Sequence, residues 1–318
     1  MFRGGSIRAW REQPLAGGLL AALLVLAGAW GIGRVAAQER KQIFVSVMES
    51  SGIPVLDLKP SDVKVFENRV PATVADVEPI DWPMKLTVLV DNGPRSADYM
   101  AALRTGLRNF LNEIPDGVEV SIKTLAPRPQ WVLRPTTDLE KEMKSVDLIG
   151  PDSGTGKFFD GLAETAERIE KERGNYFSVI LLVTSDVGGS DAPFDREWQA
   201  LKKRVNDYAI TVHYVTLVTG TQSGRSVPGL MQTTIGIPLT EFTGGRYENI
   251  NSASRLVTLL PEIGQQIASS HFRQTHQYRV TYEPPVATAD SREPKGVSVS
   301  VSSRGPVNVI PTANGRLP

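Results

Sequence analysis

An apolar, β-branched run from Leu86 to Val90 limits the fold more than any other stretch of the sequence. It ends at a carboxylate, Asp91, and Asn92-Gly93-Pro94 follows. A run this short and this apolar predicts a strand that is buried on both faces, in the middle of a parallel sheet. The Asn-Gly-Pro sequence predicts a sharp turn after it. We therefore expect Asp91 at the carboxyl end of a central strand, where open α/β sheets bind their ligands.

The rest of the central region alternates between strand and helix patterns. Apolar runs recur at residues 177–183, which lead through Thr184-Ser185 to Asp186, and at residues 209–218. Between the runs, apolar residues stand at helical spacing in residues 100–111, 159–169 and 194–205, and again in residues 256–267. This alternation predicts a doubly wound, mostly parallel α/β sheet of the Rossmann-like kind. Residues 220–236, rich in Gly, Ser, Thr and Gln, predict a long exposed loop.

Short strand patterns flank this α/β region on both sides, at residues 42–75 and 278–310. Neither group has enough strands to bury a core alone, so we expect the two groups to pair into one small β-module. The predicted organisation is a signal peptide at 1–37, an N-terminal β segment at 38–82, the α/β domain at 83–272 and a C-terminal β segment at 273–318.

The N-terminus has the pattern of an export signal. Three arginines precede an apolar stretch, and Val35-Ala36-Ala37 fits a small-residue cleavage site. We expect the mature chain to begin near Gln38 and to be periplasmic or extracellular; if the signal stays uncleaved, residues 15–33 would anchor it to the membrane. The 318-residue chain has no cysteine, which suits a bacterial envelope better than a disulfide-stapled module. Its zero net charge argues against a nucleic-acid partner.

Three segments of the central region resemble the loops of a von Willebrand factor type A (VWA) domain. They are residues 91–95 (Asp-Asn-Gly-Pro-Arg), residues 154–162, which begin Gly-Thr-Gly-Lys, and residues 183–186 (Val-Thr-Ser-Asp). The flanking segments 55–67 and 261–282 are similar to those of a bacterial envelope subset of this family. The resemblance implies the VWA fold and a function in binding other proteins.

The family's metal-ion-dependent adhesion site is degenerate in this sequence. The resemblance implies two aspartate ligands, here Asp91 and Asp186, two serines, here replaced by Gly93 and Arg95, and a threonine. Counting back from Asp160 puts Gly156 at the threonine position and Thr155 one residue out of register. Mg²⁺ and Ca²⁺ need oxygen ligands, and a guanidinium beside the site repels a cation.

Our hypothesis is therefore a crevice that needs no cofactor, in which Arg95 replaces the cation and pairs with Asp91, Asp186 or both. Two alternatives remain open for these aspartates. They could hold Mg²⁺ or Ca²⁺, or they could only cap loops and helix N-termini.

We expect a non-enzymatic, adhesion-type protein that binds another protein, with the ligand-binding residues Asp91, Gly93, Arg95, Thr155 and Asp186. An acidic side chain of the partner would form a bidentate salt bridge with Arg95. The alternatives are cation-dependent binding through the two aspartates, an envelope scaffold that uses the β-module and residues 220–236, and an aspartate-based phosphotransferase with Asp91 as nucleophile. The last lacks a nearby second acid, and residues 150–157 depart from the spacing of a phosphate loop.

Overall fold

A computed structural model describes residues 40–172, 174–187, 189, 194–219, 230–285, 296–302 and 305–316. The predicted signal peptide and residues 220–229 lie outside these ranges, and the domain boundaries given above stay predictions. Within the described ranges, no helix combines the length and the apolar character that crossing a membrane requires.

The α/β domain is built on a six-stranded sheet with β4 near its middle, as predicted. The strand order is β6-β5-β4-β7-β8-β9, and every neighbouring pair is parallel except β5 and β6. The strands span Met84–Val90 (β4), Glu119–Thr124 (β5), Gln130–Thr136 (β6), Phe177–Ser185 (β7), Thr211–Leu217 (β8) and Tyr247–Ile250 (β9). All side chains of β7 are buried, as expected for a strand covered on both faces.

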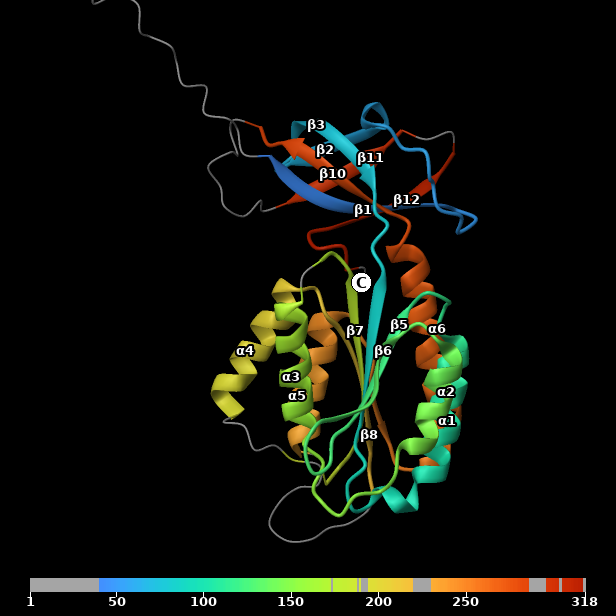
Figure 1. The fold of residues 1–318 in the computed structure, drawn as a ribbon. Coiled ribbons are helices and arrows are strands. Elements are labelled where there is room, and N and C mark those ends of the chain that lie inside the picture. Colours follow the sequence, from blue (N-terminus) through green and yellow to red (C-terminus); the bar gives the residue numbers. More distant parts are fainter. Residues whose placement is uncertain are drawn as a thin grey trace, which may run out of the picture. The chain divides into compact units, whose positions relative to one another are not determined.

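Three helices cover each face of this sheet (Figure 1). One face carries α1 (Met100–Glu113), α2 (Leu139–Leu148) and α6 (Leu256–Gln274), and the other carries α3 (Phe158–Lys171), α4 (Phe194–Asp207) and α5 (Leu230–Thr243). Short 3₁₀ helices span Pro60–Asp62, Ser96–Asp98 and Ala253–Arg255. The doubly wound α/β fold predicted from the alternating patterns is thus confirmed.

Helix α5 corrects one sequence prediction. Residues 230–236 belong to this helix and not to an exposed loop, and Ile235 and Leu239 are buried in the core beneath it. The Gly, Ser, Thr and Gln content of the segment indicated a loop. Packing of these apolar residues against β8 overrides that weak local preference.

The β-module is a six-stranded antiparallel sheet made from both ends of the described chain, as predicted. Its order is β11-β2-β3-β10-β1-β12, and the outermost strands, β11 and β12, also contact each other, so the sheet curls around its own core. The strands span Lys41–Glu49 (β1), Val63–Glu67 (β2), Val70–Pro79 (β3), Gln277–Glu283 (β10), Val297–Val301 (β11) and Val307–Thr312 (β12) (Figure 1). Its core is separate from the two cores of the α/β domain.

Helix α6 contains a proline, Pro261, whose cost to the helix is offset by its neighbour α1. Proline has no N–H, so the carbonyl of Val257 loses its helical donor. The side-chain amide of Asn109 donates to that oxygen at 3.3 Å.

We expect Asn109→Leu to lower the free energy of unfolding by about 1 kcal/mol, because it leaves this carbonyl without a partner. Urea denaturation would measure the change. Asn112→Leu, at an exposed position of the same helix, is the control and should have almost no effect. Equal losses in the two variants would contradict this role for Asn109.

Candidate functional site

The loops that follow β4 and β7 meet the loop that precedes α3 at the carboxyl edge of the sheet. The backbone N–H of Asp152 donates to the carbonyl of Asn92 at 2.7 Å, which joins the first loop to the second. The N–H of Gly189 donates to the carbonyl of Gly156 at 2.8 Å, which joins the third loop to the second. Segments almost one hundred residues apart in the sequence thus form one surface, as the resemblance implied.

The carboxylate of Asp91 is buried at the centre of these loops. Its Oδ1 accepts a hydrogen bond from the N–H of Gly93 at 2.9 Å. Its Oδ2 accepts from the hydroxyl of Ser185 at 2.7 Å and from the N–H of Ser185 at 3.1 Å, with the hydroxyl of Thr184 at 3.4 Å. Such hydrogen bonds compensate the charge for the loss of water. Both carboxylate oxygens of Asp91 therefore accept hydrogen bonds from groups of the protein itself.

Glycines complete the surroundings of this carboxylate. A Cβ atom added to Gly156 would stand 2.0 Å from Oδ1 of Asp91, and one added to Gly93 would stand 3.1 Å from the same oxygen. Thr155 is exposed on the outside of the loop. The structure therefore places Gly156, and not Thr155, against Asp91, in agreement with the register counted from the sequence.

Asp186 lies at the end of β7 and is also buried. Its Oδ1 accepts hydrogen bonds from the N–H of Thr219 at 3.0 Å and from the hydroxyl of Thr219 at 2.8 Å. Its Oδ2 is buried and has no hydrogen-bond partner among the residues that the structure describes. The side chain next to it, Val187, is an exposed apolar group at the rim of the site.

The ion pair predicted for Arg95 is not formed. Its Nη2 lies 3.2 Å from Oδ2 of Asp98, and no salt bridge joins Arg95 to Asp91 or Asp186 in the described part of the chain. The cause is local: Ser96–Asp98 is a 3₁₀ helix, in which side chains three residues apart lie on the same side. The side chains of Arg95 and Asp98 are 41% and 68% exposed, so this pair lies at the surface of the site.

Three further residues that the sequence did not single out organise the site. The amide of Asn92 donates to the carbonyl of Gly150 at 2.9 Å and accepts from the N–H of Ala126 at 2.9 Å. Ser185 supplies two of the donors to Asp91. The hydroxyl of Tyr99 donates to the carbonyl of Asp91 at 3.3 Å; burial, and then the Asp91 charge, raise the pKa of Tyr99 well above its usual range.

No protein-family model matches the sequence, and neither does any curated protein. Similar solved structures include a von Willebrand factor type A protein from Catenulispora acidiphila, at 11% identity and a TM-score of 0.46, covering 74% of this chain and 51% of that one. BatB from Bacteroides thetaiotaomicron has 13% identity and a TM-score of 0.43, covering 58% and 98%. The pilus adhesin SpaC from Lactobacillus rhamnosus GG has 12% identity and a TM-score of 0.48, covering 73% and 34%. This chain thus spans about half of the first structure and a third of the last. Likenesses this distant carry no argument about function.

The strand order and the meeting of the three loops at the carboxyl ends of β4 and β7 agree with the resemblance found in the sequence. The α/β domain therefore has the doubly wound fold and the loop arrangement that the resemblance implied. The resemblance implies that the family's metal site would lie at this loop edge.

The residues at this edge of the α/β domain do not fit a divalent cation. Gly93 and Gly156 offer no side-chain oxygen, both oxygens of Asp91 accept hydrogen bonds from the protein, and the unpartnered Oδ2 of Asp186 cannot supply a six-oxygen shell alone. Within the described residues, no group of three or more His, Asp or Glu side chains could hold a metal ion.

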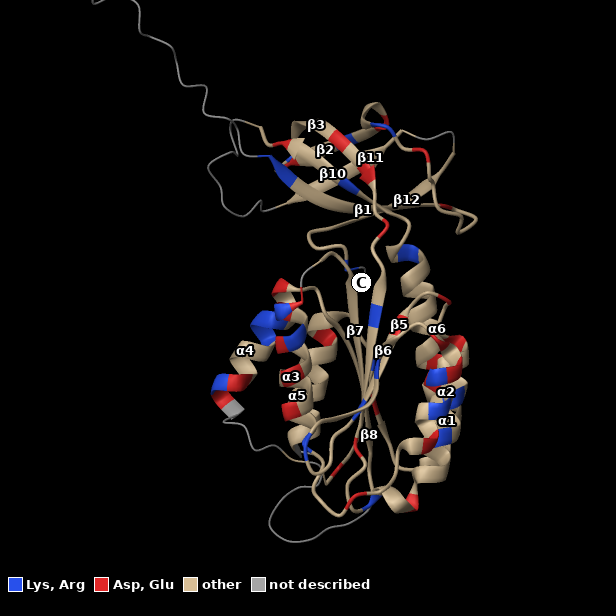
Figure 2. Cartoon of the chain, viewed as in Figure 1, with Lys and Arg blue, Asp and Glu red and all other residues tan. Residues whose placement is uncertain are grey.

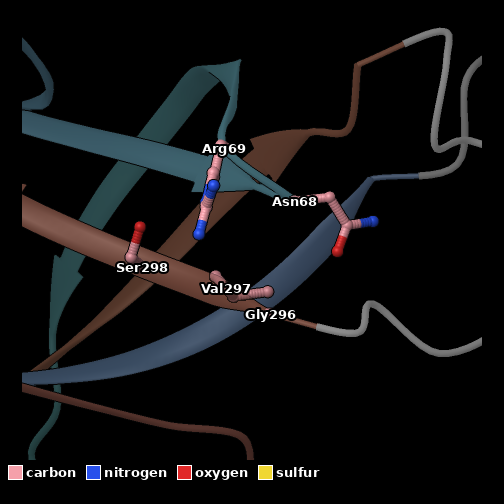
Figure 3. A pocket seen from close by; sticks show the side chains of 5 residues that line it. All are labelled: Asn68, Arg69, Gly296, Val297 and Ser298. Atoms are coloured by element: carbon pink, nitrogen blue, oxygen red, sulfur yellow. The ribbon is translucent and has the colours of Figure 1, made fainter.

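Two other features of the molecule do not suggest a second site. A shallow hollow of about 480 Å³ lies in the β-module, where Arg69 extends toward β11 (Figure 3), and its lining has no acid, histidine or other reactive group. It is lined by Asn68, Arg69, Gly296, Val297 and Ser298. Helices α2 and α4 carry side chains of both charges (Figure 2), unlike the basic stripe typical of nucleic-acid binding.

Proposed function

We propose that this is an exported, non-enzymatic protein whose VWA domain binds another protein through the loop edge, without a divalent cation. Arg95 is the observation that carries this proposal. It is a partly exposed guanidinium at the position where the family places a metal ligand, and its only ion-pair partner among the described residues is the exposed Asp98.

The pair between Arg95 and Asp98 is suited to exchange. An ion pair between exposed side chains stabilises a protein by about 0–1 kcal/mol, so a carboxylate of the partner can displace Asp98 at little cost. Arg95 then offers a planar fork for a bidentate salt bridge. The exposed Val187 and Thr155 would add contact area beside it.

An enzymatic role for Asp91 is less well supported. A nucleophilic carboxylate needs an oxygen that is free to attack. Both oxygens of Asp91 are bonded to protein donors, and the residue is buried beneath the loops.

We expect Arg95→Glu to reduce partner binding at least about tenfold, which corresponds to about 1.4 kcal/mol. The tagged full chain would be expressed in its source cells and cross-linked, and the captured proteins would be quantified by mass spectrometry. Arg108→Glu is the matched control, because Arg108 is similarly exposed (37%) and also pairs with an aspartate, Asp147, away from the loop edge. A partner retained by Arg95→Glu as well as by Arg108→Glu would argue against this binding surface.

Export is tested separately from binding. We expect the mature N-terminus near Gln38, because Val35-Ala36-Ala37 fits a cleavage site. Mass spectrometry of the protein purified from its source cells would identify that terminus. An intact N-terminus in a protein found in the cytoplasm would contradict export.

A further inference from the structure

We infer that the Asp91 carboxylate is an internal tie, meaning that its contacts join the three loops to one another. It occupies the space that a side chain at position 156 would need. This inference concerns how the loop edge is built and does not depend on the identity of any partner. It assigns Asp91 a positioning role, in contrast to the ligand-binding role expected from the sequence.

The hydrogen bonds of Asp91 reach two of the loops directly. Oδ1 holds the first loop through the N–H of Gly93, and Oδ2 holds the end of β7, where the third loop starts, through the N–H and the hydroxyl of Ser185. Because the same carboxylate serves both, moving it would release two connections at once. Arg95 lies two residues beyond Gly93, so the tie also fixes the start of the segment that presents Arg95.

The second loop is held by close packing. A Cβ atom at position 156 would stand 2.0 Å from Oδ1, 2.5 Å from Cγ and 3.0 Å from Oδ2 of Asp91. All three atoms belong to the carboxylate. Gly156 does not have the positive φ that favours glycine, so its backbone conformation does not demand glycine. The requirement is for space beside the carboxylate of Asp91.

This arrangement leaves no room for the threonine that the resemblance would place at position 156. A threonine at position 156 and the observed carboxylate compete for the same volume, so the two cannot coexist in this structure. The donors on Gly93 and Ser185 supply the compensation that a cation would otherwise give to a buried carboxylate. The loops are thus fixed by protein groups alone.

A double-mutant cycle tests the tie, with the thermal unfolding midpoint of the full chain as the measured quantity. We expect Gly156→Ala to lower the midpoint by about 5 °C or more, as a large steric clash should in a chain of this size. Gly150→Ala in the same loop is the matched control, because its added Cβ meets no atom within 4 Å. It should leave the midpoint unchanged.

Asp91→Ala removes the three atoms that lie nearest to the new Cβ. We therefore expect Gly156→Ala to leave the unfolding midpoint almost unchanged in the Asp91→Ala background. The effects of the two substitutions would then be strongly coupled. Asp91→Asn keeps the volume of the side chain, so Gly156→Ala should remain costly there. If Asp91→Ala does not fold, the comparison of Gly156→Ala with Gly150→Ala, together with a lowered midpoint for Ser185→Ala, still tests the tie.

Two results would overturn the inference. The first is additive effects of Gly156→Ala and Asp91→Ala. The second is a rise in the midpoint of the wild-type protein on addition of Mg²⁺ or Ca²⁺ that disappears in Asp91→Ala, because that would assign Asp91 to a cation. Neither result depends on partner capture, so failure of this inference is distinguishable from failure of the proposed function.

Discussion

Lys41→Met is expected to lower the free energy of unfolding by about 3–5 kcal/mol, because it leaves a buried carboxylate in the β-module unpaired. Glu67 has no exposed side-chain surface, and its Oε1 lies 2.9 Å from Nζ of Lys41, whose side chain is 23% exposed. Oε2 of Glu67 has no hydrogen-bond partner within the described part of the chain. Burial, and then the charge of Glu67, raise the pKa of Tyr282 to about 12. Among the described residues, the buried carboxylate of Glu67 therefore has one cationic partner, Lys41, and a neighbouring hydroxyl, that of Tyr282.

Replacing both partners should restore most of the stability. Well-packed apolar side chains in place of a buried ion pair are often neutral or stabilising, so the double variant Lys41→Met with Glu67→Met should unfold near the wild-type urea midpoint. Lys64→Met, at an exposed position of β2, controls for the loss of a surface lysine and should change stability by less than about 0.5 kcal/mol. A Lys41→Met variant no less stable than Lys64→Met would contradict the dependence of Glu67 on Lys41.

The sequence predicted the elements whose signals are local and repetitive. The run from Leu86 to Val90 gave the position of Asp91, because an apolar strand can be buried on both faces only near the middle of a sheet. The same reasoning placed Asp186 after β7. Gly156, which counting from Asp160 put at the threonine position, lies against Asp91 in the structure.

The contacts of the site were predicted poorly, because they depend on side-chain directions between distant segments. Arg95 was expected to point toward Asp91, but a short 3₁₀ helix turns it toward Asp98. The hydrogen bonds from Ser185 to Asp91 connect residues that are 94 positions apart in the sequence, and no local sequence pattern predicts such contacts. Helix α5 was missed for a related reason: its polar residues indicated a loop, whereas the buried side chains of Ile235 and Leu239 decide its conformation.

Stability between about pH 4 and pH 7 should depend on two buried groups that act in opposite directions. Burial, and then the charge of Arg246, lower the pKa of His213 from 6.5 to about 4. Burial, and then the charge of Asp138, raise the pKa of Glu142 from 4.5 to about 7. Below pH 6.5 the unfolded chain binds a proton at His213 that the folded protein excludes, so this term destabilises the fold as the pH falls. Between pH 4.5 and 7 folded Glu142 holds a proton that the unfolded chain releases, so that term destabilises the fold as the pH rises.

Removing either group should expose the effect of the other. His213 alone contributes a loss of about 3 kcal/mol between pH 7 and pH 4, from the difference of its two pKa values. His213→Gln keeps an acceptor for the N–H of Arg246, which now donates to Nδ1 at 3.3 Å, and should lose less stability on acidification than the wild type. Glu142→Gln should lose more, because the opposing term is gone. Urea unfolding of the three proteins across this range measures the slopes. Parallel curves for His213→Gln and the wild type would mean that His213 is not held neutral in the fold, since a group with the same pKa in both states adds no slope.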